Sequence, residues 1–458
     1  MKELNFFLRF SAEKEIKKES ANERINFEQN WSSCPEICKC NEKKKEITCS
    51  DKTLDSFPDD LPSNVESVIF VESNLRELEN VSNLLSLKKL DLSRSQVQNI
   101  SKKSFINVPE LLNLDLSVNE FSSIGEEAPF SVPKDAFENL PKLKTLKIGF
   151  NKITKINDDS FAGLEKLEEL NLEYNSISEI EEKAFSNLSK LRKIFLNGNS
   201  LHSIPEKVFT WMPNLNTANL DKNALRSLSK KQFTKMQKIT RLHLARNEIS
   251  RVSHLNLANL TNLEYLDLSY NSISHPDDFE KNIKINHLSL KGNKLFNLLG
   301  SPFSELQQLN HLDLAENELK IIPDVFRQNP GLMFLFLDRN RIEVIDENIL
   351  DPLWRLATLT LSNNQINKIH DGAFKNLANF YYLNLSRNSL KIPTTGLVNP
   401  KNIGTSYDFS ENPWTCDCHI KEFHDYLQRL PNRRAVDIVC AHPDHLRGRN
   451  LRNLTASG

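Results

Sequence analysis

The sequence predicts an α/β-class solenoid, a horseshoe of about 15 turns with a parallel β-sheet on its concave side and irregular or 3₁₀ segments outside. Three observations predict it. A short pattern of leucines that ends in asparagine recurs along the chain, its dominant spacing is 24 residues, and cysteines occur only near the two ends. Such a period indicates stacked repeats rather than the globular domains into which 458 residues would otherwise divide.

The repeat reads Leu-x-x-Leu-x-Leu-x-x-Asn, and Leu263, Leu266, Leu268 and Asn271 form one copy. The alternating Leu-x-Leu predicts a short strand with one buried face. The asparagine side chain should turn inward and bond backbone groups that are otherwise unpaired where the strand ends. The asparagine position is filled in 15 turns, at spacings of 24 except for 22 (twice), 23 and 32, by Ser73, Ser95, Asn119, Asn151, Asn175, Asn199, Asn223, Asn247, Asn271, Asn293, Asn317, Asn340, Asn364, Asn388 and Asn412.

A phenylalanine recurs about ten residues after the asparagine, and we expect these rings to form a spine that packs the convex side. They are Phe105, Phe137, Phe161, Phe185, Phe209, Phe233, Phe303, Phe326 and Phe374. No single turn can bury its apolar face, so stability should come from stacking on neighbouring turns. The 32-residue turn carries about eight extra residues around 125–133, which predict either a functional loop or a tolerated surface bulge.

Composition excludes several classes of function. A formal net charge of −1 with 26% charged residues favours neither a nucleic-acid binder nor a membrane-surface binder. No apolar run approaches the ~20 residues of a membrane span. The sequence has no Gly-Lys, His-Glu-x-x-His or Gly-x-Ser-x-Gly motif, and we interpret Asp267 and Asp313 as part of a solvated strand face. We therefore expect neither an enzyme nor a cofactor.

The seven cysteines form two terminal clusters, which predict disulfide-stapled caps in an oxidising compartment. Residues 1–33 look like a flexible leader with no visible secretion signal. An alternative for the second cluster is a zinc site, although its spacing matches no standard finger. That site would draw on Cys416, Cys418, His419, His424, Cys440, His442 and His445.

The cysteine motifs resemble those of extracellular leucine-rich-repeat proteins. Cys34-Pro35-Glu36-Ile37-Cys38-Lys39-Cys40 with Cys49 resembles the family's N-terminal flank, and Asn412-Pro413-Trp414-Thr415-Cys416-Asp417-Cys418 its C-terminal flank. The family includes Slit-like and Toll-like ectodomains and the acid-labile subunit of growth-factor complexes. The resemblance covers residues 34–458 and implies a cap at 34–63, repeats at 64–411 and a second cap at 412–458.

The same resemblance implies the disulfides Cys34–Cys40, Cys38–Cys49 and Cys416–Cys440. The second cap has no fourth cysteine, so we expect Cys418 to be unpaired and the chain to be cut short within this cap. Between the cysteines a short helix over the last turn is predicted, because helical spacing is kept by Ile420, Phe423, Leu427 and Leu430.

The resemblance implies a non-enzymatic binding scaffold, either a receptor ectodomain or a secreted binding subunit, for a protein ligand or co-receptor. The alternative is an adhesion or matrix protein that acts through homophilic or matrix contacts, and a homophilic protein would form a homo-oligomer. A saturable soluble ligand favours the first function and self-association the second.

Outward side chains of the predicted strands form columns along the concave face. The column six residues before the asparagine reads Lys193, Thr217, Arg241, Tyr265, His287, His311, Phe334, Thr358 and Tyr382. The column four residues before it reads Phe195, Asn219, His243, Asp267, Ser289, Asp313, Phe336, Thr360 and Asn384. Aromatic residues beside polar groups are typical of binding hot spots. We therefore place the centre of the site at Tyr265, His287, His311, Phe334 and Phe336, unless these rings merely stack along the sheet. Because unperturbed histidine titrates near ~6.5, binding should change between about pH 7 and 5.5.

Seven Asn-x-Ser/Thr sequons are candidate glycosylation sites, namely Asn30, Asn80, Asn99, Asn187, Asn259, Asn384 and Asn453. We expect Asn384 to lie on the concave face, where a glycan would block its C-terminal end and leave the predicted site clear.

Overall fold

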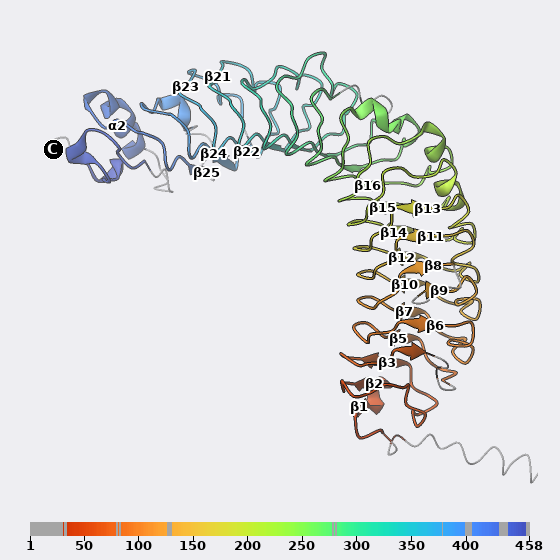
Figure 1. Cartoon of the computed structure of the whole chain (residues 1–458). Coiled ribbons are helices and arrows are strands. Elements are labelled where there is room, and N and C mark those ends of the chain that lie inside the picture. The colour runs from red at the N-terminus through yellow and green to blue at the C-terminus, as the bar shows by residue number, and fades with distance from the viewer. Residues whose placement is uncertain are drawn as a thin grey trace, which may run out of the picture.

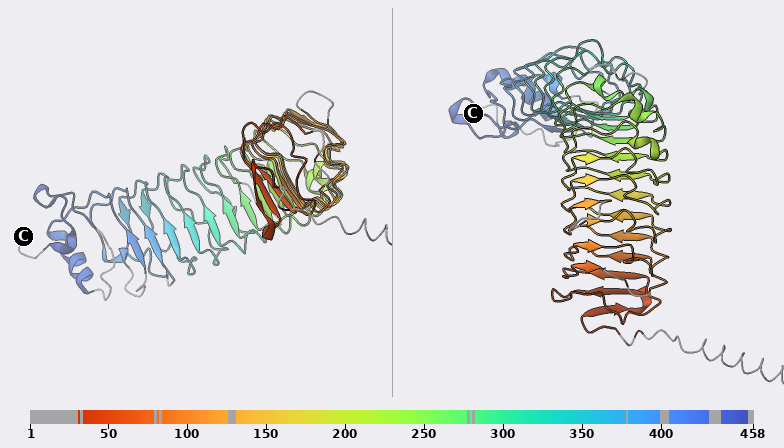
Figure 2. Two further views of the ribbon diagram at one scale, coloured as in Figure 1. Left: turned by 90° about the horizontal axis from the view of Figure 1, so that it is seen from below. Right: turned by 45° about the vertical axis from the view of Figure 1, so that its right-hand side comes forward.

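The computed structural model describes residues 31, 34–78, 81, 84–125, 131–276, 279, 282–377, 379–398, 405–429 and 438–454. These residues form an arched solenoid in which two arms meet near β16 (Figure 1). A 17-stranded sheet follows the concave side of both arms (Figure 2). The predicted horseshoe is therefore confirmed. Apart from Trp31, the predicted leader lies outside the described residues.

The concave sheet starts in the N-terminal cap, where β1 (Cys38–Asn41) pairs antiparallel with β2 (Glu46–Cys49). Fifteen further strands continue it in parallel, one for each predicted turn. They are β3 (Ser67–Phe70), β5 (Lys89–Asp91), β7 (Asn113–Asp115), β10 (Thr145–Lys147), β12 (Glu169–Asn171), β14 (Lys193–Phe195), β15 (Thr217–Asn219), β16 (Arg241–His243), β17 (Tyr265–Asp267), β18 (His287–Ser289), β19 (His311–Asp313), β20 (Phe334–Phe336), β22 (Thr358–Thr360), β24 (Tyr382–Asn384) and β25 (Ser406–Asp408).

Away from this sheet the turns carry short strands and 3₁₀ segments. The strands, which the sequence did not predict, are β4 (Glu77–Leu78), β6 (Asn99–Ile100), β8 (Ser123–Ile124), β9 (Ser131–Val132), β11 (Lys155–Ile156), β13 (Glu179–Ile180), β21 (Val344–Ile345) and β23 (Lys368–Ile369). The predicted 3₁₀ segments are present as η3 (Val208–Trp211), η4 (Lys230–Phe233), η5 (Val252–Leu255), η6 (Leu257–Asn259) and η7 (Thr395–Leu397). Most of the predicted extra loop, residues 126–130, lies outside the described part of the chain.

The phenylalanine spine is buried as predicted. Phe161 is fully buried, and its ring lies 6.4 Å from that of Phe137 and 5.7 Å from that of Phe185. Strands on the concave side are spaced at only about 4.8 Å. Because the outer rings are farther apart than the inner strands, each turn is wedge-shaped and the stack curves.

The asparagine ladder joins each turn to the one before it. Asn271 Nδ2 donates to Leu268 O (3.0 Å) in its own turn and to Leu244 O (2.9 Å) in the preceding turn. Its Oδ1 accepts from Ile249 N at 3.0 Å. By contrast, among the described residues Ser95 Oγ donates only to Ser93 O, within its own turn. The asparagine amide therefore provides a bond between turns that serine is too short to make.

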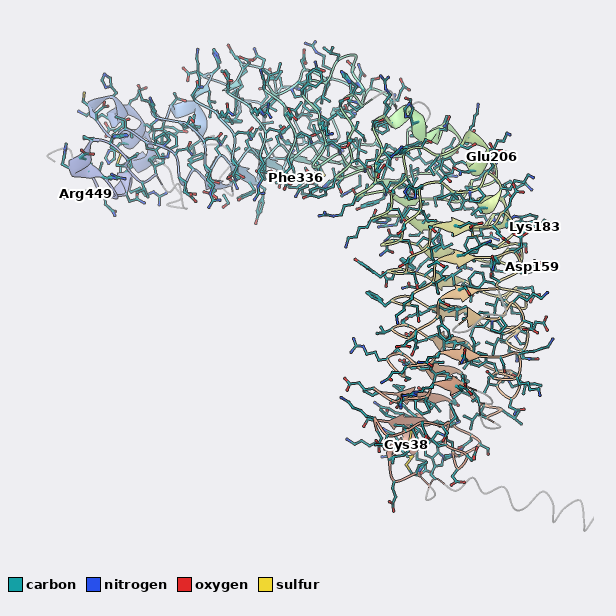
Figure 3. All side chains as sticks on the ribbon, in the orientation of Figure 1. Cys38, Asp159, Lys183, Glu206, Phe336 and Arg449 are labelled. Atoms are coloured by element: carbon teal, nitrogen blue, oxygen red, sulfur yellow. A yellow bond between two sulfur atoms is a disulfide. The ribbon has the colours of Figure 1, made fainter. Side chains whose placement is uncertain are left out.

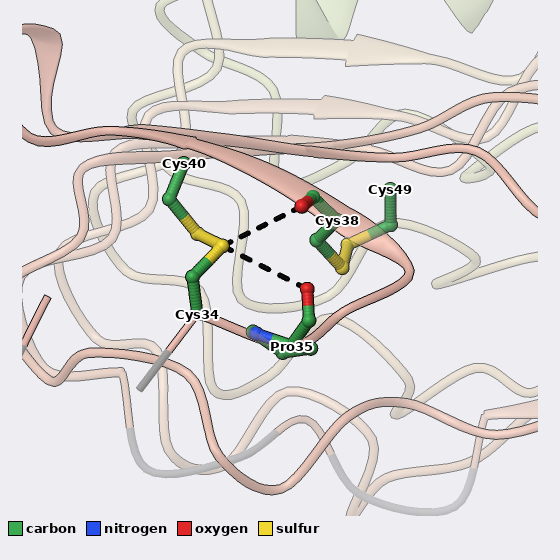
Figure 4. The surroundings of a disulfide bond; sticks show 5 residues. All are labelled: Cys34, Pro35, Cys38, Cys40 and Cys49. Atoms are coloured by element: carbon green, nitrogen blue, oxygen red, sulfur yellow. Dashed lines mark hydrogen bonds between the residues drawn. A yellow bond between two sulfur atoms is a disulfide. The ribbon is translucent and has the colours of Figure 1, made fainter. Parts of the chain in front are cut away.

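Disulfides close both ends as the family resemblance implied. Cys34–Cys40 and Cys38–Cys49 staple the N-terminal cap (Figure 4), with η2 (Glu42–Lys44) between β1 and β2. At the other end Cys416 is bonded to Cys440.

The C-terminal cap is built around the predicted helix, α2 (Lys421–Arg429), with η8 (Cys418–Ile420), η9 (Asp444–Leu446) and η10 (Leu451–Asn453). Tyr426 of α2 donates to Val398 O at 2.7 Å, which fixes the helix over the last turn. In the described part of the chain, no helix is long and apolar enough to span a membrane.

Candidate ligand-binding face

The strand register forms the two predicted columns on the concave face. Tyr265, His287, His311 and Phe334 are successive partners across β17 to β20. Phe336 lies one strand along from Asp313 in the second column and projects from the inner side of the C-terminal arm (Figure 3). All five predicted site residues therefore share one face of four neighbouring strands.

Their rings form one continuous stack. Ring centroids are 4.4 Å apart between Tyr265 and His287, and 3.9 Å apart between His287 and His311. His311 then lies 5.8 Å from Phe334 and 5.0 Å from Phe336. The rings cover one another, so each is only partly exposed, and the cluster is held in shape before any partner arrives.

The stack begins one strand earlier than the sequence interpretation placed it. His243 of β16 lies 4.8 Å from the Tyr265 ring, and the Arg241 guanidinium lies 5.5 Å from the centroid of the same ring. His243 stands in the second column, diagonal to Tyr265, so the pattern of the first column alone does not include it. We add it to the candidate site.

The aspartates next to the rings cap the ends of the strands. The interpretation from the sequence, in which they are simply part of a solvated strand face, does not include this role. Asp267 accepts a hydrogen bond from Ser269 N and Asp313 accepts one from Ala315 N, both at 2.9 Å. Burial raises the pKa of Asp313 and raises that of Asp221, one strand before His243, to about 6. The concave face thus combines aromatic rings with carboxylates that are partly shielded from water.

Burial also lowers the pKa values of the histidines, chiefly because the removal of water disfavours the charged imidazolium. It lowers the pKa of His243 and of His287, and lowers the pKa of His311 to about 4, with a further contribution from the neighbouring His287. His311 therefore stays neutral in the folded chain between pH 7 and 5.5. The change in binding that was expected over this range cannot come from the titration of His311.

This shift predicts an acid-labile fold. In the unfolded chain His311 titrates near ~6.5, while in the folded chain its pKa is about 4. As the pH falls from 6.5 towards 4, the unfolded state binds a proton that the folded state cannot, so stability declines over this window. After allowance for its partial exposure, we expect His311 to account for about 1–2 kcal/mol.

Urea denaturation between pH 7 and 4.5 measures this effect. His311→Phe keeps a ring in the stack but removes the titration, so its stability should fall less with pH than that of the wild type. His202→Phe, at an exposed position outside the stack, should behave like the wild type. An identical pH slope for His311→Phe and the wild type would rule out this role for His311.

The sequons are spread over several surfaces. Asn384 ends β24 in the second column, two strands from Phe336, or about 10 Å at strand spacing. A glycan there would therefore border the predicted site rather than leave it clear. Of the others, Asn453 is exposed, Asn99, Asn187 and Asn259 are partly buried, and Asn30 and Asn80 lie outside the described residues.

The C-terminal cap does not form the alternative zinc site. Cys416 and Cys440 are bonded to each other in a disulfide. Two of the thiolates that zinc would need are therefore not free to bind it. Cys418 is a free and exposed thiol, as expected. Among the described residues, Cys418 is grouped closely enough to share a metal ion with Asp417 and His419, and all three are exposed.

Comparison with known protein families identifies the repeats. A model described as BspA type leucine rich repeat region matches residues 130–264, and two leucine rich repeat models match 262–282 and 283–342 with 355–395. Together they cover more than half of the chain. The chain belongs to the leucine-rich-repeat family and has a disulfide-bonded flank at each end.

Similar proteins include a glycoprotein and a receptor. Trophoblast glycoprotein from Macaca fascicularis is 27% identical over 218 residues, which cover 37% of this chain and 52% of that protein. Toll-like receptor 5 from Homo sapiens is 29% identical over 164 residues, which cover 34% of this chain and 18% of the receptor. This chain therefore matches about half, or less, of the length of these relatives.

Solved structures share the fold at low identity. TLR13 in its complex with ssRNA13 has a TM-score of 0.67 and 23% identity, covering 83% of this chain and 58% of that one. Toll in the Toll–Spatzle complex from Drosophila has a TM-score of 0.64 and 20% identity, covering 86% of this chain and 60% of that one. These structures share the horseshoe architecture with most of this chain.

Proposed function

We propose that this chain is an extracellular protein-binding scaffold, a receptor ectodomain or a secreted binding subunit, whose concave face holds a protein ligand or co-receptor. The centre of the site is the stack of Tyr265, His287, His311, Phe334 and Phe336, which His243 extends. The observation that carries the proposal is that these rings, although they stack along the sheet, all stay partly exposed on the inner face of the arch.

Such a stack suits a binding hot spot for a physical reason. Aromatic side chains supply a large contact area, and binding energy is concentrated in a few residues of this kind. Rings that already pack on one another lose little conformational freedom when a partner arrives, so less of the interaction energy is spent on ordering them. The polar edges of Tyr265, His287 and His311 add hydrogen-bonding groups beside the apolar faces.

The cellular setting follows from the caps and the relatives. Disulfides persist in oxidising compartments, which favours an extracellular location. The similar proteins include a Toll-like receptor and a glycoprotein, and the Toll structure is a complex with Spatzle. Together these features favour a protein ligand, while the carboxylates along the concave face disfavour nucleic acid even though one protein of this fold binds RNA.

A double substitution tests the site. The wild-type chain is screened against purified secreted proteins and cell-surface ectodomains, and the partner found is titrated against Phe334→Ala/Phe336→Ala. We expect the affinity to fall by about 2 kcal/mol, or about 30-fold, because two central rings are lost.

The matched control is Leu299→Ala/Ile321→Ala, which removes two exposed apolar side chains away from the concave columns. It should bind like the wild type. If the control loses affinity and the Phe334/Phe336 variant does not, the concave site is wrong. If the screen yields only self-association, the adhesive alternative replaces the receptor function.

A further inference from the structure

A second surface lies on the N-terminal arm, at the edge of the concave sheet. Three turns in succession place an apolar residue directly before the repeat asparagine, and all three are exposed: Val118 by 42%, Phe150 by 47% and Tyr174 by 37%. The rings of Phe150 and Tyr174 stack with centroids 4.7 Å apart. We call Val118, Phe150 and Tyr174 the apolar wall.

The backbone at these positions does not suit such side chains. The φ angles are +58° at Val118, +56° at Phe150 and +50° at Tyr174, in the left-handed region. A bulky residue there costs on the order of 1 kcal/mol or more, whereas glycine and asparagine adopt it readily. Two other turns do place glycine at this position, Gly198 and Gly292. Most of the remaining turns carry a charged residue there, such as Lys222, Arg246 and Glu316. The Tyr174 hydroxyl accepts a hydrogen bond from Lys222 Nζ at 2.6 Å, but neither burial nor the backbone conformation requires the apolar side chains of Val118 and Phe150.

A hollow of about 420 Å³ lies beside the wall. Its lining includes Val118 and Phe150 together with residues of the concave columns. Ser93 and Ser117, two short side chains, contribute to its surface. The volume is within the range of binding pockets and accommodates a few amino-acid side chains.

The lining of the hollow contains four carboxylates, Glu72, Asp91, Asp115 and Glu173, and two cations, Arg94 and Lys147. Glu72 is paired with Lys52, whose Nζ lies 3.3 Å away. Asp115 is paired with Lys147, whose Nζ lies 3.5 Å away. Asp91 accepts hydrogen bonds from the backbone and hydroxyl of Ser93, and Glu173 from amides such as that of Asn171. Within the described residues, no Lys, Arg or His nitrogen lies within 4.0 Å of the Asp91 or Glu173 carboxylate. These two groups are therefore complementary to a positive charge.

We propose that this hollow docks an extended segment of a partner protein that carries a lysine or arginine beside an apolar side chain. The apolar side chain packs on Val118 and Phe150, and the cation pairs with Asp91 and Glu173. The surface is independent of the ring stack, because it belongs to the other arm of the arch (Figure 1). A partner held between the arms would touch both surfaces.

Fluorescence anisotropy with three labelled peptides tests the proposal on the whole chain. The probes alternate lysine with leucine, glutamate with leucine, or lysine with serine. The lysine–leucine peptide should bind best, because it alone satisfies both the wall and the carboxylates. Val118→Asn/Phe150→Asn and Asp91→Asn/Glu173→Gln should each weaken it by about fivefold or more.

Two controls separate docking from unfolding and from general charge attraction. Val118→Asn should melt at the wild-type temperature or above, because asparagine tolerates the left-handed backbone. Phe334→Ala/Phe336→Ala should leave the affinity for the peptide unchanged, even if the function proposed for the ring stack fails.

Three results would overturn the proposal: equal binding of the lysine–leucine peptide to the wild type and the wall variant, equal binding of the glutamate–leucine peptide, or no peptide binding at all. If sedimentation then shows a wild-type dimer that the wall variant does not form, the occupant is a second copy of the chain.

Discussion

Replacing Phe161 with alanine should lower the free energy of unfolding by about 4 kcal/mol, since large-to-small changes of a buried phenylalanine cost about 3–5 kcal/mol. The ring is fully buried and stacked on both sides, against Phe137 and Phe185. Its removal opens a cavity between three consecutive turns. Because each turn is stabilised only by its neighbours, the loss should concentrate in this part of the N-terminal arm.

Urea denaturation measures the total loss, and hydrogen exchange locates it. The matched control is Phe296→Ala, since that ring is 48% exposed and should change stability by less than about 1 kcal/mol. If Phe161→Ala and Phe296→Ala cost the same, the convex spine does not stabilise the solenoid.

Replacing Asn271 with alanine should cost about 2–3 kcal/mol. The change removes the acceptor for Ile249 N and the donor for Leu244 O and Leu268 O, and the side chain is only 8% exposed. A buried backbone group that loses its partner costs about 1–3 kcal/mol. Asn271→Ser should lose almost as much, because the hydroxyl of Ser95 does not reach the neighbouring turn.

The control for this prediction is Asn262→Ala. Asn262 Nδ2 also donates to a carbonyl of the preceding turn, Gln237 O at 2.7 Å, but this hydrogen bond is exposed to solvent. Water can replace that bond, so the melting curve should hardly move. A melting temperature of Asn271→Ala equal to that of the wild type would contradict the ladder.

Most of the fold follows from the spacing of a few residue types. A leucine pattern that ends in Asn271 predicts a strand with one buried face. The register between strands follows, because stacked turns of similar length bring equivalent residues together. The curvature is harder to predict, because it depends on how far apart the outer side chains pack. Similarly, the short strands β11 and β13 carry no signal of their own, since Lys155–Ile156 and Glu179–Ile180 pair only once the turns are stacked.

The sequence predicts which residues of the candidate site lie in one column, but not the environment in which each side chain is placed. Equal spacing is enough to place Tyr265, His287 and His311 on one face of the sheet. Their pKa values depend on how much water the neighbouring strands exclude, which no single turn reveals. The apolar wall is hard to interpret for a related reason. Val118 and Phe150 stand directly before the asparagine in successive repeats, but their exposure and their backbone angles become known only in the folded stack.

Hydroxyl-radical footprinting of the chain, free and bound to its partner, tests the central claim most directly. Aromatic rings and imidazoles are oxidised where they are exposed, so the method reports on Tyr265, His287, His311, Phe334 and Phe336 individually. We predict that oxidation of these five side chains falls when the partner binds, while that of Trp354, which is 49% exposed and outside the two columns, does not change. Unchanged oxidation of all five, in a complex that protects other parts of the chain, would contradict the assignment of the concave ring stack as the binding site.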